Sequence, residues 1–163
     1  MVILGIDPGF GTLGYGAIET VRGNHRVLTY GAITTPPRKD MPRRLHEIFH
    51  DLLTLLDTIK PDAVAIEQLF FNTNITTGIQ VAQARGIILL ACAERGIEIS
   101  EYTPLQVKQA VVGYGRAEKK QVMEMTRMML KLEKIPRPDD AADALAIALC
   151  HAATAGSLLS QIK

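Results

Sequence analysis

The chain has 163 residues, of which 47% are hydrophobic, and its 18 basic and 17 acidic residues leave a formal net charge of +1. This length is typical of one domain, so we expect residues 1–163 to form a single domain in which about 156–163 are a frayed tail. The longest apolar run, Ile87–Ala93, is far shorter than the roughly 20 residues of a membrane-spanning helix. We therefore expect no membrane association.

The expected compartment is the cytoplasm. The N-terminus lacks a basic region followed by an apolar core, which a secretory signal would have. Cys92 and Cys150 lie in apolar surroundings without CxxC spacing, which favours two buried free thiols over a disulfide or a metal site.

The N-terminal part predicts three short strands. We expect strands over Val2–Asp7, Tyr15–Thr20 and Val27–Ile33, joined by a glycine-rich turn and by the polar turn at Gly23-Asn24. Strands joined by such short turns are typically antiparallel hairpins.

The first turn carries Gly9, Gly11 and Gly14, the G-x-G-x-x-G spacing of a dinucleotide-binding turn. That motif needs a helix after the glycines to hold the pyrophosphate, whereas the next residues, YGAIET, favour a strand. The first strand also ends in Asp7, whose carboxylate would repel a phosphate. We therefore interpret the glycines as a tight hairpin turn.

The rest of the chain alternates helices and strands. We predict a helix from about Arg43 to Ile59, a strand over Asp62–Gln68, a polar loop at NTNITT, a helix over Thr77–Arg95, a strand over Ile97–Tyr102, and helices beginning near Pro104, near Ala117 and after Pro138. This order predicts an α/β protein with a mixed sheet and helices on its faces.

Four acids fall at positions that suggest convergence. Asp7 and Glu67 each end a buried strand, and a crossover helix between parallel strands would place the two ends side by side. Asp140 and Asp143 are spaced i,i+3 and share one face of the strongly apolar last helix, where Asp139 is expected to cap the N-terminus.

Carboxylates that converge without enough basic partners favour a divalent cation. Oxygen ligands prefer Mg²⁺ or Mn²⁺, and two such ions about 4 Å apart can activate water in phosphoryl transfer. His46 and His50 are spaced i,i+4 without the glutamate of a metalloprotease, so a packing or surface role is expected for them. No serine or cysteine nucleophile motif appears.

Two basic stretches indicate a basic face beside this acidic pocket, although such runs are also typical of ordinary solvated surface. One contains Arg38, Lys39, Arg43 and Arg44, and the other contains Lys108, Arg116, Lys119 and Lys120.

Five segments together resemble the RuvC family of Holliday-junction resolvases. They are GIDPGFGTLGYG, IEQLFF, QVAQARG, PLQVKQAVVGYGRAEKKQV and DDAADALAIAL, in order from Gly5 to about His151. The resemblance implies a ribonuclease H-like fold with a five-stranded mixed sheet in the order 3-2-1-4-5 and helices on both faces. It also implies a homodimeric, Mg²⁺-dependent endonuclease of DNA recombination and repair, which makes paired symmetric nicks in four-way junctions and leaves 5′-phosphate and 3′-hydroxyl ends.

The resemblance also implies individual roles. Asp7, Glu67, Asp140 and Asp143 correspond to the family's catalytic acids, which would hold two Mg²⁺ ions, with Mn²⁺ as a substitute. Lys119 corresponds to a catalytic lysine near the scissile phosphate, Lys108 to a DNA-binding residue, and Phe70 to a residue that stacks on an opened base. The helix Thr77–Arg95 corresponds to the family's dimer contact. The junction-binding and branch-migration proteins RuvA and RuvB are implied partners.

Three alternatives stay open at this point. A nuclease of the same fold that processes RNA would share the strand-end acids but would need neither Phe70 nor the dimer helix. A sugar-kinase or actin-like ATPase would also begin with a strand ending in aspartate, but it needs a duplicated domain and a second phosphate loop. A non-catalytic DNA-structure binder would not need the four acids.

Overall fold

The computed structural model describes residues 1–68 and 75–161. The strands are β1 (Val2–Asp7), β2 (Thr12–Val21), β3 (Asn24–Thr34), β4 (Ala63–Glu67) and β5 (Ile99–Tyr102). The helices are α1 (Met41–Ile59), α2 (Ile75–Glu94), α3 (Pro104–Val112), α4 (Lys119–Met129) and α5 (Asp139–Gln161). All the predicted elements are present, with ends displaced by a few residues.

The strands form one mixed sheet in the order β3-β2-β1-β4-β5, which confirms the expected topology. β1, β2 and β3 pair antiparallel, whereas β4 pairs parallel with both β1 and β5. The parallel pairing of β1 and β4 sets Ile6 opposite Ile66. The next residues, Asp7 and Glu67, are the last residues of these two strands. Their side chains therefore lie at the edge of the sheet that the carboxyl ends of β1 and β4 form.

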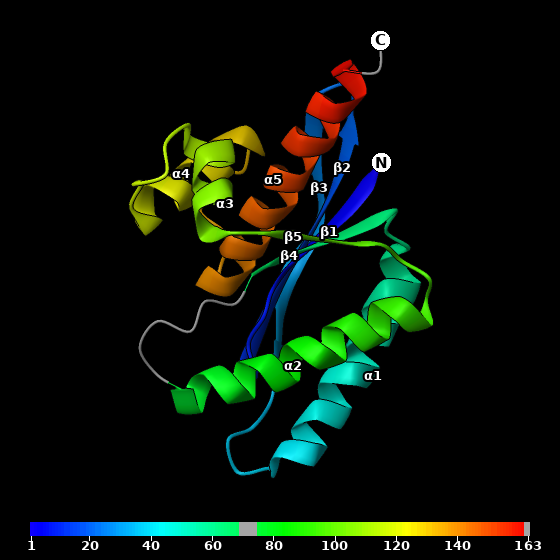
Figure 1. Cartoon of the computed structure of the whole chain (residues 1–163). Helices are drawn as coiled ribbons and strands as arrows, with labels where there is room; N and C mark the ends of the chain where they lie inside the picture. Colours follow the sequence, from blue (N-terminus) through cyan, green and yellow to red (C-terminus); the bar gives the residue numbers. More distant parts are fainter. Residues whose placement is uncertain (69–74, 162–163) are drawn as a thin grey trace.

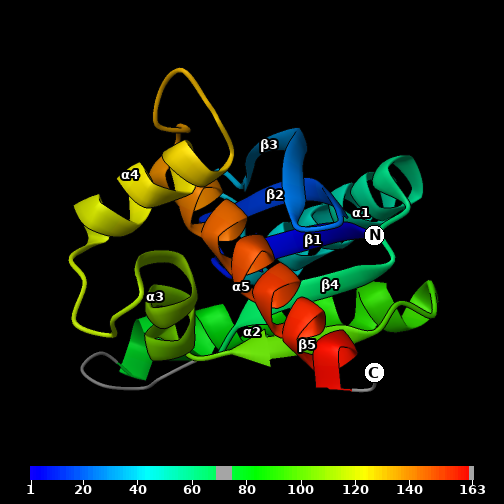
Figure 2. The ribbon, with the colours of Figure 1, turned by 90° about the horizontal axis from the view of Figure 1, so that it is seen from above.

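Helices cover both faces of the sheet (Figure 1). On one face α3, α4 and α5 pack over Ile3, Ile18 and Ala65. On the other face α1 and α2 pack over residues that include Leu4, Ile6, Val64 and Ile66. Seen from above, α5 lies across the strands with α3 and α4 beside it (Figure 2).

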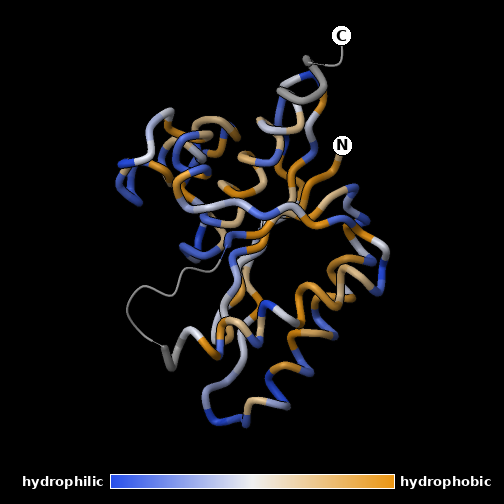
Figure 3. The backbone as a smooth tube through the Cα atoms, viewed as in Figure 1, coloured by the Kyte–Doolittle hydropathy of each residue, from blue (hydrophilic) through white to orange (hydrophobic). Residues whose placement is uncertain are grey.

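Each helix has identifiable local causes. In α1, Arg44, Ile48, Leu52 and Leu56 recur every four residues on the buried face, and Figure 3 shows hydrophobic and hydrophilic residues alternating along this helix. It begins with a proline in its first turn and ends at Lys60, whose left-handed backbone closes the last turn. Thr103 and Gln106 form a reciprocal capping box that begins α3.

The glycines after β1 differ from their predicted role. Only Gly9 and Gly11 belong to the turn, because β2 already begins at Thr12 and contains Gly14 and Gly16. A Cβ atom on Gly14 would lie 2.1 Å from the Asp140 carbonyl oxygen, and one on Gly5 would lie 2.0 Å from that of Ala144. These glycines therefore allow α5 to lie directly on the sheet, which the hairpin interpretation of Gly14 did not foresee.

Three smaller expectations have definite outcomes. Both cysteines are buried and free. α2 begins at Ile75, not Thr77, and ends at Glu94. The expected frayed tail, 156–163, overlaps the last turns of α5, which runs to Gln161, and residues 162 and 163 lie outside the described residues. Within the described part of the chain, no helix is both long and apolar enough to cross a membrane.

Candidate active site

Alternation along the strands places two acids on the same face of the sheet. Ile3 packs on the α5 side and Leu4 and Ile6 on the opposite side, so Asp7 shares the α5 side with Ile3. In β4, Ala65 packs on the α5 side, and Glu67 follows it by two residues. Asp7 and Glu67 therefore face α5 from adjacent strand ends.

The first turns of α5 bring the other two acids to this edge. α5 packs against β1, β2 and β4, and the close approach at Gly14 fixes the backbone of Asp140 over β2. The predicted cap residue Asp139 is instead the first helical residue, and its carboxylate pairs with Arg137. Asp140 and Asp143 remain as the site's helix acids.

The electrostatics of Asp7 show that the acids act on one another. Burial raises the pKa of Asp7 to about 7, and the negative charges of Asp143, Glu67 and Asp140 contribute to the rise. Burial and the charge of Asp143 also raise the pKa of Glu67. Lys119 lowers both pKa values and Lys108 lowers that of Glu67, so the two lysines compensate only part of the negative charge.

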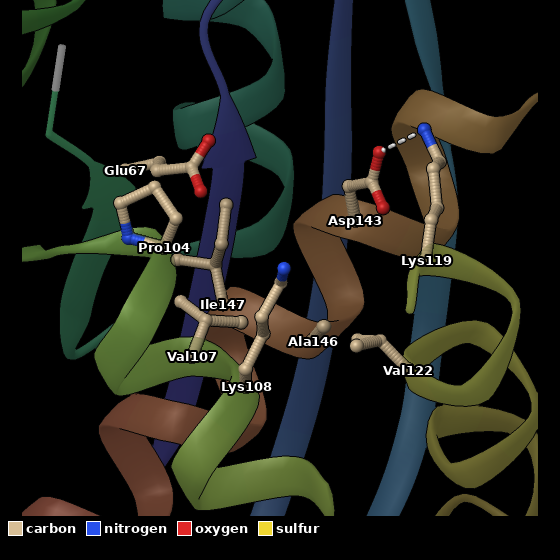
Figure 4. A pocket seen from close by; sticks show the side chains of 9 residues that line it. All are labelled: Glu67, Pro104, Val107, Lys108, Lys119, Val122, Asp143, Ala146 and Ile147. Carbon is tan, nitrogen blue, oxygen red and sulfur yellow. Dashed lines mark hydrogen bonds and ion pairs between the residues drawn. The ribbon is translucent and has the colours of Figure 1, made fainter. Parts of the chain in front are cut away.

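The lysines lie at a pocket of about 170 Å³ beside these acids (Figure 4). Lys119 Nζ lies 2.7 Å from Asp143 Oδ2, and the Lys108 side chain points toward the same opening. Glu67 and Asp143 supply the acidic lining, and apolar residues of α3, α4 and α5 form its walls, namely Pro104, Val107, Val122, Ala146 and Ile147. An apolar wall beside charged groups strengthens their interaction.

The donor set suits a hard divalent cation, because it contains only carboxylate oxygens and a surplus of negative charge. Among the described residues, however, no three histidine, cysteine, aspartate or glutamate side chains already converge on one point. One of these carboxylates, that of Asp143, accepts a hydrogen bond from Lys119.

The first basic stretch is exposed at Arg38, Lys39 and Arg43 but not at Arg44. Lys39 pairs with Glu47, Arg43 Nε lies 3.6 Å from Asp40 Oδ1, and Arg44 is buried with 7% of its surface exposed. In the second stretch Arg116, Lys119 and Lys120 are exposed, and Lys108 reaches the pocket. The two cations that line the pocket, Lys108 and Lys119, come from the second stretch.

No sequence motif indicates the contact between Lys119 and Asp143 or the burial of Arg44, although the second had another signal. The pair of Lys119 with Asp143 joins residues 24 positions apart. The burial of Arg44 had a signal, because Arg44 lies on the same four-residue spacing as the buried Ile48, Leu52 and Leu56. Phe70, the predicted base-stacking residue, lies outside the described residues.

Comparisons with known proteins agree with this architecture. The chain is similar to Thermus thermophilus RuvC, with a TM-score of 0.90, 39% identity and 96% of each chain covered. It is also similar to T. thermophilus RuvC in complex with a Holliday junction substrate, with a TM-score of 0.89, 37% identity and the same coverage. The sheet order and the acids at its edge define the class as a ribonuclease H-like nuclease.

The particular family follows from the sequence comparisons. The family model described as crossover junction endodeoxyribonuclease RuvC matches residues 3–151. The protein of that name from Syntrophomonas wolfei is 58% identical over 151 residues, which are 93% of this chain and 88% of the relative. The chain belongs to the RuvC family of crossover junction endodeoxyribonucleases. It is thus a nuclease that acts on Holliday junctions, and its family implies dependence on a divalent metal ion.

Proposed function

We propose that the chain acts as a homodimer that makes two symmetric nicks in opposing strands of a four-way DNA junction. Asp7, Glu67, Asp140 and Asp143 would hold Mg²⁺ ions, two per site, with Mn²⁺ as a substitute. The observation that carries this proposal is the convergence of the four acids at one end of the sheet, where burial and the charges of the other three acids raise the pKa of Asp7. Such repulsion within a nuclease fold is what a pair of divalent ions would relieve.

The bound ions would supply an activated water and stabilise the leaving oxygen, giving 5′-phosphate and 3′-hydroxyl ends. The chain's own groups orient the DNA. Lys119 and Lys108 act as point charges for the backbone phosphates, since both lie at the pocket beside Glu67 and Asp143. Lys119 donates a hydrogen bond to Asp143, and its Nζ would be shared with a backbone phosphate if Asp143 helped to hold an ion.

The dimer is proposed to form through α2. This helix buries Ala84, Ile88 and Ala91 against the rest of the molecule, yet it leaves Ile79, Leu89 and Leu90 exposed by 55%, 37% and 48%. Two nicks placed symmetrically require two sites related by a two-fold axis, and exposed leucines favour such a self-complementary contact.

The proposal also covers the base contact of Phe70, the protein partners and the cellular compartment. Phe70 would stack on an unpaired base at the junction centre. RuvA and RuvB would deliver the junction and drive branch migration. The cytoplasm is the proposed location, because free buried thiols such as Cys92 and Cys150 suit a reducing compartment.

The experiment that tests the catalytic assignment is the Asp7→Asn substitution. The amide keeps the shape of the carboxyl group and removes its charge, so we expect cleavage of a synthetic four-way junction in Mg²⁺ to be lost while junction binding survives. The matched control is Asp139→Asn, because Asp139 lies in the first turn of α5 but pairs with Arg137. Near wild-type nicking by Asp7→Asn would refute the assignment.

A further inference from the structure

Arg44 is a buried cation in an unfavourable position. Its exposed fraction is 7%, and none of the ion pairs among the described residues involves it. It also lies in the first turn of α1, where the helix dipole disfavours positive charge. A charge persists in such a place only if specific contacts compensate for the lost water.

These contacts are with Thr35, just after β3, and with Phe10, in the turn between β1 and β2. Arg44 Nε donates to Thr35 Oγ1 at 2.9 Å, and Nη2 donates to the Phe10 carbonyl oxygen at 3.1 Å. The guanidinium also lies over the Phe10 ring, 4.6 Å from its centroid.

Thr35, which is 5% exposed, completes the arrangement. Its hydroxyl donates to the same Phe10 carbonyl at 2.6 Å, and its backbone N–H donates to the Gly11 carbonyl at 3.1 Å. Thr35, which follows β3, and Arg44, near the start of α1, therefore both hold the Phe10 carbonyl.

This turn carries Asp7 at its beginning. Asp7 is the last residue of β1, and Gly9 and Gly11 flank Phe10 on either side. Pro8 and the pairing of Asp7 with Gly14 restrain the start of the turn, whereas the glycines on either side of Phe10 leave that part of it flexible, so outside contacts at Phe10 restrain what the sheet does not. The Phe10 carbonyl, three residues after Asp7, is the point at which two other elements fix it.

We infer that Arg44 is a positioning residue, which together with Thr35 fixes the Phe10 carbonyl and through it the place of the Asp7 carboxylate in the site. Arg44 reaches the Phe10 carbonyl, three residues after Asp7, so it acts through the backbone of the turn. The inference rests on the proposed function in one respect, namely that Asp7 is a metal ligand.

The test compares the Mn²⁺ affinity of Arg44→Gln with that of wild type. Isothermal titration calorimetry of the protein without DNA measures it. We expect Mn²⁺ affinity to fall by about tenfold, the scale typical of residues that orient a metal ligand. The Mg²⁺ concentration for half-maximal cleavage should rise in parallel, while junction affinity without metal stays within about twofold, because the substitution leaves Lys108 and Lys119 in place. Arg44→Lys, which keeps the positive charge and one donor nitrogen, should bind Mn²⁺ more tightly than Arg44→Gln does.

The matched control is Arg43→Ala. Arg43 is the adjacent arginine of the same turn of α1, its side chain is 79% exposed, and it pairs with Asp40. Its loss should leave Mn²⁺ affinity unchanged, which separates the contact at Phe10 from a general loss of positive charge.

A folded Arg44→Gln protein with wild-type Mn²⁺ affinity would overturn the inference. So would an Arg43→Ala protein that loses as much Mn²⁺ affinity as Arg44→Gln does. If Arg44→Gln does not fold, Thr35→Val decides, because it removes the shared hydroxyl and keeps the arginine. Weakening of Mn²⁺ binding by about threefold supports the inference and wild-type binding overturns it. The titration needs no DNA, so failure of the wild-type protein to cut junctions would refute the proposed function separately.

Discussion

The pKa of Asp7 links the acidic site to stability. Burial and the nearby carboxylates raise the pKa from 3.8 to about 7 in the folded protein, so the folded state binds this proton more tightly than the unfolded chain does. Protonation of Asp7 therefore stabilises the folded protein. The stabilisation is complete below the pKa that Asp7 has in the unfolded chain, and it is lost as pH rises through about 7. Glu67, whose pKa is also raised, acts in the same direction.

Asp7→Asn should therefore stabilise the metal-free protein in a pH-dependent way. We expect no difference from wild type near pH 4 and a gain on the order of 2–4 kcal/mol in the free energy of unfolding at pH 8. Denaturant unfolding in EDTA at both pH values measures this difference in the free energy of unfolding. Added Mg²⁺ should make the difference at pH 8 smaller, because it binds and stabilises the wild-type protein. A gain that is equal at both pH values would contradict the expected coupling among the acids.

Lys119 is the residue whose loss should separate chemistry from binding. In Lys119→Ala, single-turnover cleavage should slow by at least about tenfold because a cation near the reacting phosphate is missing. Junction affinity should change by less than about threefold, since one of several phosphate contacts is lost. The acid limb of the pH–rate profile should also move to higher pH, because Lys119 lowers the pKa of Asp7.

The control for this substitution is Lys120→Ala, the exposed neighbour on the same turn of α4. It should leave the rate and the pH profile unchanged. An unchanged single-turnover rate in Lys119→Ala would exclude the role given to this lysine.

Sequence reasoning succeeded at single residues where the backbone alone decides the outcome. Asp7 and Glu67 are strand-end residues, and parallel pairing of β1 with β4 is enough to bring them together. The contacts of Lys119 with Asp143 and of Arg44 with Phe10 depend on side chains from separate elements. Nothing in the local sequence around either partner specifies them.

At the scale of elements, the position of α5 depends on glycines of the strands beneath it. Gly14→Ala would place a Cβ atom 2.1 Å from the Asp140 carbonyl oxygen, and backbone cannot give way as a flexible side chain can. We expect destabilisation of about 1–3 kcal/mol from overpacking. Cleavage should fall further than stability explains, because the displaced turn carries Asp140.

Gly156→Ala, in α5 itself, is the control, since a Cβ atom there meets nothing within 4 Å. It should leave the midpoint of thermal unfolding unchanged or raise it slightly, because alanine favours helix. Equal midpoints and equal activity for Gly14→Ala and wild type would contradict the close contact between α5 and β2.

The elements themselves were predictable because hydrophobic periodicity and breakers such as Lys60-Pro61 mark them locally. The glycines were harder to interpret, since a glycine that turns a hairpin and one that admits a helix look alike in sequence. Gly9 serves the first purpose and Gly14 the second, and only the packing of α5 distinguishes them.

At the scale of the whole molecule, the exposed apolar face of α2 predicts the oligomeric state. Leu90→Glu should convert a dimer into a monomer in sedimentation, because it places a charge in an apolar contact. Met128→Glu, on α4, is the control, since Met128 is 56% exposed and lies on the opposite side of the sheet. A Leu90→Glu protein that remains dimeric would show that another surface forms the dimer.

The most direct test of paired cleavage uses a supercoiled plasmid that extrudes a cruciform, incubated with Mg²⁺ and excess protein. Two nicks made within one bound dimer linearise the plasmid, so wild type should yield linear product from the first turnover. A mixed dimer of wild type and Asp7→Asn should yield nicked circles instead, because one site is inactive. Nicked circles as the only first product of the wild-type dimer, or linear product from the mixed dimer, would contradict the account.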